Sequence, residues 1–239
     1  MLSAAEKDFL RLDESLLPFR IIEAKTEFDL ERVARIRSVS YGRHLPALAE
    51  TMKTPDANDY NPSYRSLLAL SKLDGSCLGT VRIQIADAEH NENLQFEQSF
   101  SIPSALKQGK AAEIARLAIP QDKSSLSVRI MLIKAAYWYC RFSQVNHVFL
   151  CARRPLDRFY KGFDLRDLTP NGEFVNMAHI GDVPHRIFWF HTLDIEAHWK
   201  AISNPMYPLY FRTLHPDLLD NVQLRALMNE QFQRQQRCA

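Results

Sequence analysis

Glycine is scarce in this chain, and the glycines present do not form a nucleotide-binding motif. Only 7 of the 239 residues are glycine. None of them falls in a G-x-G-x-x-G or a G-x-x-x-x-G-K-[ST] pattern. The sequence therefore argues against a dinucleotide-binding fold and against a P-loop.

Cysteine is equally scarce and has no paired spacing. The four cysteines, Cys77, Cys140, Cys151 and Cys238, are scattered without a C-x-x-C pair. Three of them fall in apolar strand or helix contexts, which favours buried free thiols over disulfides or zinc ligands. We therefore expect a cytoplasmic protein. The eight histidines form no H-x-x-x-H or H-E-x-x-H pattern, so no metal site is expected.

Long apolar runs and an excess of one charge are also absent. No apolar run reaches the length of a transmembrane helix, and residues 1–8 lack the basic and apolar regions of a signal peptide. The 30 basic and 28 acidic residues give a formal net charge of only +2, which argues against a generic nucleic-acid binder. With 46% hydrophobic residues, the chain can bury the core of one large domain with at most a modest appendage.

Residues 111–120 form the stretch around which we expect the chain to be organised. Their apolar run, closed by Pro120, predicts a strand buried on both faces. Glu113 and Arg116 lie inside this strand, where a charge is costly unless it is paired or used. An internal ion pair and a catalytic role both fit. Residues three apart point to opposite faces of a flat strand, so the two can share a site only if a bulge or a splay turns one of them.

The remaining pattern predicts a mixed α/β sheet with helices on both faces. Thr26 and Asp29 offer N-terminal capping for a helix, and Asp74-Gly75 marks a hairpin turn. In the long apolar helix, Lys134 and Arg141 are expected to form one solvated edge. The predicted strands are 19–25, 66–73, 76–85, 111–120, 147–152 and 184–191. The predicted helices are 27–41, 128–142, a short one from 155, 195–202 and 216–237.

Four further charged residues lie near this framework. On the helix 27–41, Arg37 falls on or beside the core-facing stripe, where its stem can pack while its head reaches solvent. Asp56 and Asp59 lie in the irregular stretch 45–64; they can be ordinary turn residues, although long ordered loops are often functional. Arg82 lies on the polar face of its strand, which faces either a cleft or solvent.

The order and spacing of these residues resemble the GNAT acyltransferase superfamily. More narrowly, they resemble the branch fed by acyl carrier protein, which contains the N-acyl amino acid synthases and the related N-acyl-homoserine lactone synthases. The resemblance spans roughly residues 19–217. The matching features are Arg37 in the first long helix, Asp56 and Asp59 as a D-x-x-D-like cluster, Gly79-Thr80-Val81-Arg82 as a G-x-x-R strand, Glu113-Ile114-Ala115-Arg116-Leu117 as an E-x-x-R-[LF] strand, and Asn204-Pro205 with His215-Pro216-Asp217.

The resemblance implies a GNAT fold in which two splayed central strands hold a thioester-bearing pantetheine arm. It implies that Glu113 is the base or the amine anchor, directly or through water, and that Arg116 belongs to the same catalytic pair. The resemblance further implies that the guanidinium groups of Arg116, Arg82 and Arg37 hold either the loop acids or the acceptor carboxylate. The residues assigned in this way to substrate binding are Arg37, Asp56, Asp59 and Arg82.

The resemblance also assigns contacts with the acyl-pantetheine arm. Backbone N–H groups of the central strand would pair with the arm and stabilise the oxyanion. The residues given this role are Leu117, Ala118, Ile119, Ser125 and Ser127.

Two departures from the superfamily pattern bear on the donor and on the general acid. Acyl-CoA-using GNAT enzymes carry [QR]-x-x-G-x-[GA] where backbone N–H groups cradle a pyrophosphate, but residues 121–128 contain no glycine. Phosphopantetheine has no pyrophosphate, so the loss favours acyl carrier protein as donor, with simple divergence as the alternative. In place of Y-x-x-x-G-F stands Phe159-Tyr160-Lys161-Gly162-Phe163; the tyrosine is two residues too close, which favours a packing role for Tyr160.

A basic cluster follows the strand 147–152. Acyl carrier proteins present acidic helices, so their docking patch should be basic. A solvated basic face explains the same residues equally well. The docking residues predicted here are Arg153, Arg154, Arg158 and Lys161, with Arg166 in the same cluster.

The sequence thus predicts a bacterial N-acyltransferase that moves a long-chain fatty acyl group to the α-amine of an amino acid. The donor is acyl carrier protein or acyl-CoA; no bound cofactor, metal or nucleic-acid partner is expected, and membrane contact is expected only peripherally, through the lipid product. The predicted organisation is a lead-in at 1–18, an acyltransferase domain at 19–202 and a helical extension at 203–239, packed on the same domain.

Two alternatives stay open. The first is an N-acyl-homoserine lactone synthase that uses S-adenosylmethionine. Those enzymes usually carry a tryptophan near the first helix, whereas Trp138, Trp189 and Trp199 all lie downstream. The second is a non-catalytic GNAT-like module that binds acyl carrier protein or lipid without turnover.

Overall fold

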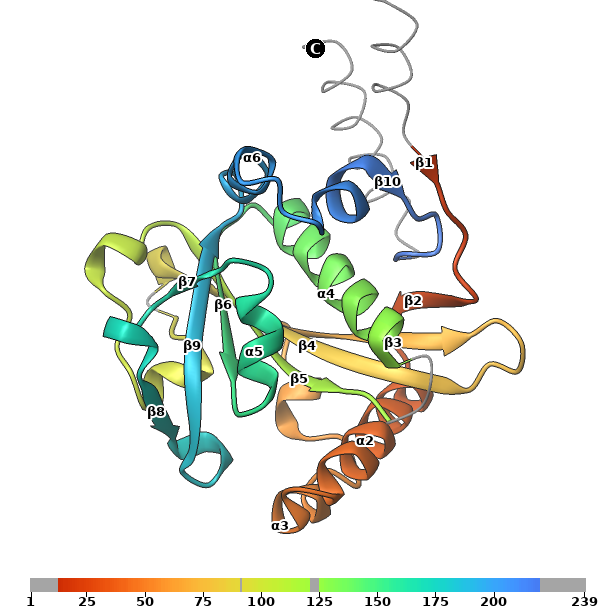
Figure 1. Cartoon of the computed structure of the whole chain (residues 1–239). Helices are drawn as coiled ribbons and strands as arrows, with labels where there is room; N and C mark the ends of the chain where they lie inside the picture. The colour runs from red at the N-terminus through yellow and green to blue at the C-terminus, as the bar shows by residue number, and fades with distance from the viewer. Residues whose placement is uncertain (1–12, 91, 121–124, 220–239) are drawn as a thin grey trace, which may run out of the picture.

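The computed structural model describes residues 13–90, 92–120 and 125–219. An eight-stranded sheet of order β2-β3-β4-β5-β6-β9-β7, with β8 also paired to β9, forms its centre (Figure 1). Its one parallel pair is β5 with β6. The strands of this sheet are β2 (Phe19–Glu23), β3 (Tyr64–Ser71), β4 (Cys77–Asp87), β5 (Lys110–Ala118), β6 (Val145–Ala152), β7 (Arg166–Asp167), β8 (Phe174–Met177) and β9 (Val183–His191).

Helical segments cover both faces of the sheet. Alternate residues of β3 divide between the faces: Leu67 belongs to the main core with α4, whereas Leu68 packs with Val33 of α2. This arrangement confirms the mixed α/β fold that the sequence predicts. The helices are α2 (Glu27–Gly42), α3 (Pro46–Glu50), α4 (Ser125–Phe142), α5 (Leu156–Lys161) and α6 (Ile195–Ala201); the short segments are η1 (Ala57–Asp59), η2 (Ala88–His90), η3 (Gln95–Gln98), η4 (Ser104–Leu106), η5 (Pro170–Gly172), η6 (Ala178–Ile180) and the π-helical η7 (Pro208–Arg212).

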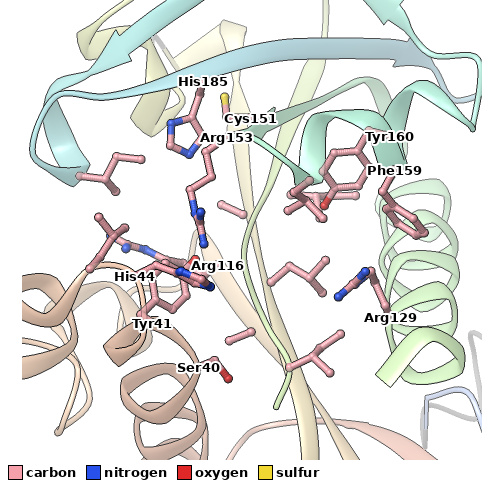
Figure 2. A pocket seen from close by; sticks show the side chains of 18 of the residues that line it. Ser40, Tyr41, His44, Arg116, Arg129, Cys151, Arg153, Phe159, Tyr160 and His185 are labelled. Atoms are coloured by element: carbon pink, nitrogen blue, oxygen red, sulfur yellow. The ribbon is translucent and has the colours of Figure 1, made fainter. Parts of the chain in front are cut away.

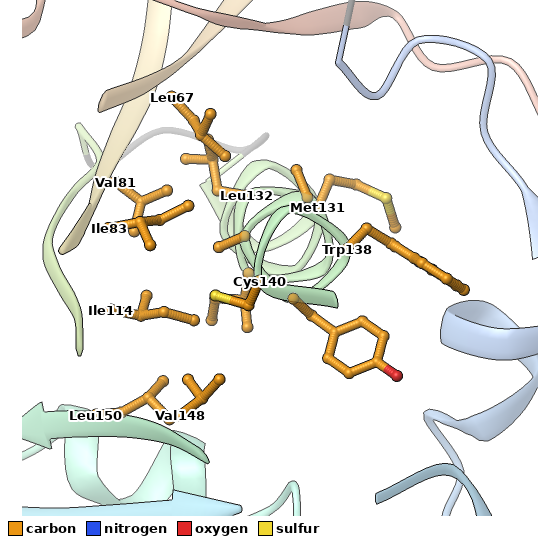
Figure 3. Packing of buried hydrophobic residues seen from close by; sticks show 14 of the residues in the cluster. Leu67, Val81, Ile83, Ile114, Met131, Leu132, Trp138, Cys140, Val148 and Leu150 are labelled. Carbon is orange, nitrogen blue, oxygen red and sulfur yellow. The ribbon is translucent and has the colours of Figure 1, made fainter. Parts of the chain in front are cut away.

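The apolar helix α4 is the centre of the largest core cluster. Its side chains meet those of four neighbouring strands, as Figure 3 shows for Leu132 and Cys140 against Val81, Ile114 and Leu150. An all-round apolar sequence is stable as a helix only when most of its surface is covered. Burial of α4 against the sheet therefore follows directly from its sequence.

The start of α2 and the β3–β4 turn form as their sequences predict. Thr26 accepts a hydrogen bond from the backbone N–H of Asp29, and the Asp29 carboxylate accepts one from the backbone N–H of Thr26. This reciprocal arrangement satisfies N–H groups that the first helical turn leaves unpaired. In the hairpin, Gly75 has a φ of 69°, a conformation that glycine adopts at little cost. The stretch 45–64, predicted to be irregular, instead contains α3 and η1.

A bulge and a splay interrupt β5. Opposite β4, Ala115 pairs with Arg82 but Ala118 pairs with Thr80, so β5 carries one extra residue at this point. Arg116 has a φ of 53° within the bulge. The pairing of β5 with β6 ends at Ile114, beyond which the two parallel strands separate. The bulge and the splay together create space in the middle of the sheet.

Lys134 contradicts the prediction of a solvated edge on α4. Its side chain is fully buried, and its ammonium donates to the carbonyl oxygens of Leu209 at 2.6 Å and Thr213 at 2.7 Å. It also contacts Nδ1 of His215 at 2.9 Å. Burial lowers the pKa of Lys134 to about 7. Lys134 thus fastens the segment 209–215 to the core.

The segment after η7 returns to the first strand of the sheet. Directly after η7, β10 (Thr213–Leu214) pairs in parallel with β1 (Asp13–Glu14) in a separate two-stranded sheet (Figure 1). Leu218 forms a β-bridge with Ile21, so the predicted helix from Pro216 is wrong for residues 216–219; residues 220–237 lie outside the described part. Among the described residues, no helix is long and apolar enough to span a membrane.

Candidate active site

A cavity of about 310 Å³ lies where β5 and β6 separate (Figure 2). Residues 113–120 of β5 and the turn after it line it along its length. The last turn of α2 contributes Tyr41, and the loop after α2 contributes His44. Arg129 of α4 and the ring of Phe159 in α5 face it from the other side, and η6 and β9 add two histidines. With Cys151 of β6, the cavity therefore gathers side chains from seven elements of the fold.

Glu113 lines this cavity from β5. Only 2% of the residue is exposed, and its Oε2 accepts a hydrogen bond of 3.1 Å from the backbone N–H of Phe96. Burial raises the pKa of Glu113 to about 7, against the opposing effect of the Phe96 bond and of the Arg116 charge. A carboxyl group with such a pKa can exchange a proton near neutral pH. The segment 86–110, which precedes most of β5, supplies this hydrogen bond through Phe96.

Arg116 lines the same cavity because the bulge turns it away from the face that a flat strand would give it. Its Nη1 is buried and has no hydrogen-bond partner among the described residues. The bulge therefore allows Glu113 and Arg116 to line one cavity, although residues three apart point to opposite faces of a flat strand. A guanidinium with an unused buried donor at a cavity wall is suited to bind an anionic group.

Arg37, Arg82 and the two loop acids come together in a separate ion network. Asp59, whose side chain is fully buried, accepts hydrogen bonds from Arg37 at 2.9 and 3.0 Å and from Arg82 at 2.8 Å. Arg82 also donates to Asp56 at 2.8 Å. Burial and the charge of Arg82 lower the pKa of Arg37 to about 10. Although burial acts in the opposite direction, the two guanidinium groups hold the pKa of Asp59 below its ordinary value.

This network lies beside the cavity rather than in its lining. The head of Arg37 is buried against Asp59 and does not reach solvent, and Arg116 is not part of the network. Asp56 is at the same time the N-cap residue of η1, accepting from the backbone N–H groups of Asn58 and Asp59. The residues balance one another's charge, and their assignment to substrate binding stays a prediction.

The residues assigned to the pantetheine arm divide into two groups. Leu117, Ala118 and Ile119 line the cavity beyond the last β5–β6 pair. Ser127 is exposed in the first turn of α4. The side chain of Ser125 and residues 121–124 lie outside the described part of the chain.

The predicted docking residues also divide. Arg153 extends into the cavity (Figure 2), whereas Arg154 is exposed and lies over the ring of Phe174 at 4.8 Å. Arg158 and Lys161 are exposed on α5. Three of the four therefore face outward next to the cavity, and the fourth lines it.

Several cavity residues escape prediction from the sequence. Tyr160, predicted to pack, packs against Phe159 and also lines the cavity. His179 and His185 reach it from η6 and β9. Burial, together with the charges of Arg116 and of His185, lowers the pKa of His179 to about 4. No spacing pattern marks these histidines, because only the folding of β9 beside β6 brings them to the cavity.

Three solved structures identify the class of fold. FeeM, an N-acyl amino acid synthase from uncultured soil microbes, is similar with a TM-score of 0.59 and 13% identity, over 75% of this chain and 93% of that chain. BjaI, a CoA-dependent acyl-homoserine lactone synthase whose structure contains SAM and isopentyl-CoA, is similar with a TM-score of 0.54 and 16% identity. The match covers 89% of this chain and 99% of that chain. A protein described as a GNAT-family acetyltransferase, from Desulfovibrio desulfuricans, is similar with a TM-score of 0.51 and 13% identity. The match covers 73% of this chain and 99% of that chain. The fold is that of the GNAT acyltransferases.

The chain belongs to the FeeM family of N-acyl amino acid synthases, whose family model matches residues 32–171, more than half of its length. It is therefore an acyltransferase, and the resemblance seen in the sequence motifs is confirmed. The matched region contains Glu113 and Arg116 but not His185. No curated protein sequence matches the chain.

Proposed function

We propose that this acyltransferase moves a long-chain fatty acyl group from acyl carrier protein to the α-amine of an amino acid. The observation that carries the proposal is the meeting of Glu113 and Arg116 in one cavity at the splay of β5 and β6. Attack of an amine on a thioester needs a base for the ammonium, donors for the oxyanion and an anchor for the acceptor carboxylate. The cavity offers groups suited to each need.

Glu113 serves as base or anchor for the amine, and Arg116 as anchor for the acceptor carboxylate. A carboxyl group whose pKa is about 7 is ionised in a large fraction of molecules at neutral pH and can accept a proton from an ammonium ion. The unpartnered Nη1 of Arg116 is matched by a carboxylate oxygen. The two side chains thus bind the two ends of an α-amino acid.

The unpaired edge of β5 receives the donor. Beyond Ile114 this strand has lost its pairing with β6, so backbone groups at Leu117–Ile119 are suited to pair with the amides of a pantetheine arm and to donate to an oxyanion. The apolar side chains of Leu117, Ile119 and Leu156 line the same cavity and suit an acyl chain. The Arg37–Asp59–Arg82 network holds α2 and η1 against β4 beside this site.

Acyl carrier protein docks on the outward-facing cations next to the cavity. Arg158 and Lys161 are exposed on α5, one wall of the cavity, and their charge complements the acidic helices of a carrier protein. The lack of glycine in 121–128 removes the backbone cradle that a coenzyme A pyrophosphate needs. Both features favour the carrier protein over coenzyme A.

The reaction is tested with the purified full chain, acyl carrier protein charged with long-chain acyl groups, and a mixture of amino acids, with products identified by mass spectrometry. We expect N-acyl amino acids from the wild type and a loss of about 100-fold or more in Glu113→Gln. The matched control is Glu31→Gln, an exposed position on α2, which should retain the wild-type rate. No product with any acceptor, from either acyl carrier protein or acyl-CoA, overturns the proposal and favours a binding module.

The donor is tested by charge reversal. Arg158→Glu combined with Lys161→Glu should raise KM for acyl carrier protein about tenfold or more and leave KM for acyl-pantetheine unchanged. Lys53→Glu, an exposed lysine on the turn after α3, is the control. Faster turnover of acyl-CoA than of acyl carrier protein at equal concentration contradicts the donor assignment.

An N-acyl-homoserine lactone synthase is the second candidate. The observation in its favour is that the match to BjaI extends over 89% of this chain, further than the match to FeeM. S-adenosylmethionine added to the same assay separates the two: formation of an acyl-homoserine lactone in place of an N-acyl amino acid establishes the second candidate.

A further inference from the structure

His185 occupies a defined position at the cavity. It precedes Arg186, the first residue of β9 that pairs with β6, and lies opposite Val175 of β8. Only 7% of the residue is exposed, and it lines the cavity wall. In Figure 2 the Arg153 side chain extends from beside His185 toward Arg116. The imidazole thus shares the end of the cavity at which an anionic acceptor group would bind.

The hydrogen bonding of His185 defines its tautomer. Its Nδ1 lies 2.9 Å from the carbonyl oxygen of Val183. Because a carbonyl oxygen can only accept, Nδ1 carries the proton, and in the neutral ring Nε2 carries a lone pair. Nε2 has no hydrogen-bond partner among the described residues. The ring is therefore held with its proton-accepting atom unoccupied.

Burial and the charges around His185 favour its neutral form. Arg116 faces it from β5, Arg153 from the end of β6 and His179 from η6, while its neighbour Arg186 is paired with Asp167. Burial lowers the pKa of His185 below its ordinary value; the Val183 bond opposes this, and the charges of Arg153 and Arg116 add to it. At neutral pH the lone pair of Nε2 is therefore available.

Formation of the amide from an ammonium ion removes two protons from the acceptor nitrogen. An ammonium nitrogen must lose one proton before it can attack the thioester carbonyl, and the positively charged nitrogen formed by attack must lose a second. Glu113 is one acceptor. We propose that Nε2 of His185 is the other, so that the cavity contains a pair of bases with the acceptor nitrogen between them. This inference rests on the proposed function and deepens it.

The step balances with these two groups. The nitrogen lone pair forms the C–N bond, and the C–S bond breaks with its electron pair leaving on sulfur. Of the two protons lost by the nitrogen, one ends on the departing thiolate and one in solvent. The products are the amide, the free thiol and one proton, with no oxidant, reductant or further reactant.

The two arginines link acceptor binding to this step. A carboxylate bound between Arg116 and Arg153 neutralises the like charges that oppose protonation of His185. Binding of the acceptor therefore makes the imidazole a stronger base than it is in the free enzyme. Since kcat/KM reports ionisations of the free enzyme and kcat those of the complex, the His185 pKa should be higher in the kcat profile.

The test compares pH–rate profiles of wild type, His185→Gln, Glu113→Gln and the control His90→Gln, whose imidazole is exposed in η2. We expect His185→Gln to lose about 100-fold in kcat. On the acid side, the slope of log(kcat/KM) against pH should decrease by one in His185→Gln and stay as in the wild type in His90→Gln. An unchanged slope and a rate within about threefold of the wild type overturn the inference.

Chemical rescue covers the case in which a lower rate reflects altered folding. His185→Ala leaves space for a ring, and imidazole added to it should restore turnover in proportion to the concentration of neutral imidazole. Absence of rescue in a folded variant, judged by its thermal transition, counts against the role. The two proposals fail in different ways: if the wild type forms no acyl product, the proposed function fails; if the wild type is active and His185 variants match it, only this inference fails.

Discussion

Replacing Glu113 with glutamine should change how the stability of the protein depends on pH. Burial raises the pKa of this carboxyl from 4.5 to about 7 in the folded state, so the folded protein holds the proton more tightly than the unfolded chain. The stabilising contribution is fully present below the unfolded pKa of 4.5 and is lost as the pH rises through 7. At about 1.4 kcal/mol per pKa unit, the loss amounts to about 3 kcal/mol.

The glutamine variant has nearly the same shape and cannot ionise. Its amide oxygen can still accept the hydrogen bond from the backbone N–H of Phe96. The stability of the variant relative to the wild type should therefore rise by about 3 kcal/mol between about pH 5 and about pH 8.5, which corresponds to about 6 to 12 °C in Tm.

Urea denaturation of both proteins across this pH range measures the difference, and contributions from all other titrating groups cancel between them. Glu31→Gln, an exposed change on α2, should follow the wild type at every pH. A stability difference that is constant with pH, or that grows toward acid, refutes the reasoning about burial.

Two further predictions concern buried charges away from the cavity. Lys134→Met leaves the carbonyl oxygens of Leu209 and Thr213 without their donor and should cost about 3 kcal/mol in urea denaturation; an unchanged midpoint would mean that water replaces the ammonium. Asp59→Asn removes the carboxylate shared by Arg37 and Arg82 and should cost about 3 to 5 kcal/mol, whereas the exposed change Glu50→Gln should leave the denaturation midpoint where it is.

Local patterns in the sequence were sufficient for most of the framework. The capping pair Thr26 and Asp29 and the turn at Asp74-Gly75 each depend on residues close together in the chain. The all-round apolar composition of α4 required burial, and burial is what the structure shows. These features are local, so hydrophobic period and turn chemistry determine them.

The features that could not be predicted from the sequence depend on residues that lie far apart in the chain. Lys134 looked like a solvated position because its acceptors lie 75 and 79 residues away. The bulge that turns Arg116 arises from the register between β4 and β5, which side-chain spacing does not encode. His185 reaches the cavity only because β9 pairs antiparallel to β6. Residues 216–219 do not form the start of the expected helix, because Leu218 forms a β-bridge with Ile21.

The burial of Lys134 has a consequence for the order in which the chain can fold during synthesis. A ribosome releases the chain from its N-terminus, so α4 emerges while the residues that accept from Lys134, at 209–215, are still to be made. Until they arrive, the ammonium must remain in water, which keeps that side of α4 open, or lose its proton. The core around α4 can therefore close over a charged Lys134 only after residues 209–215 have been translated, and until then that side of the apolar helix stays exposed.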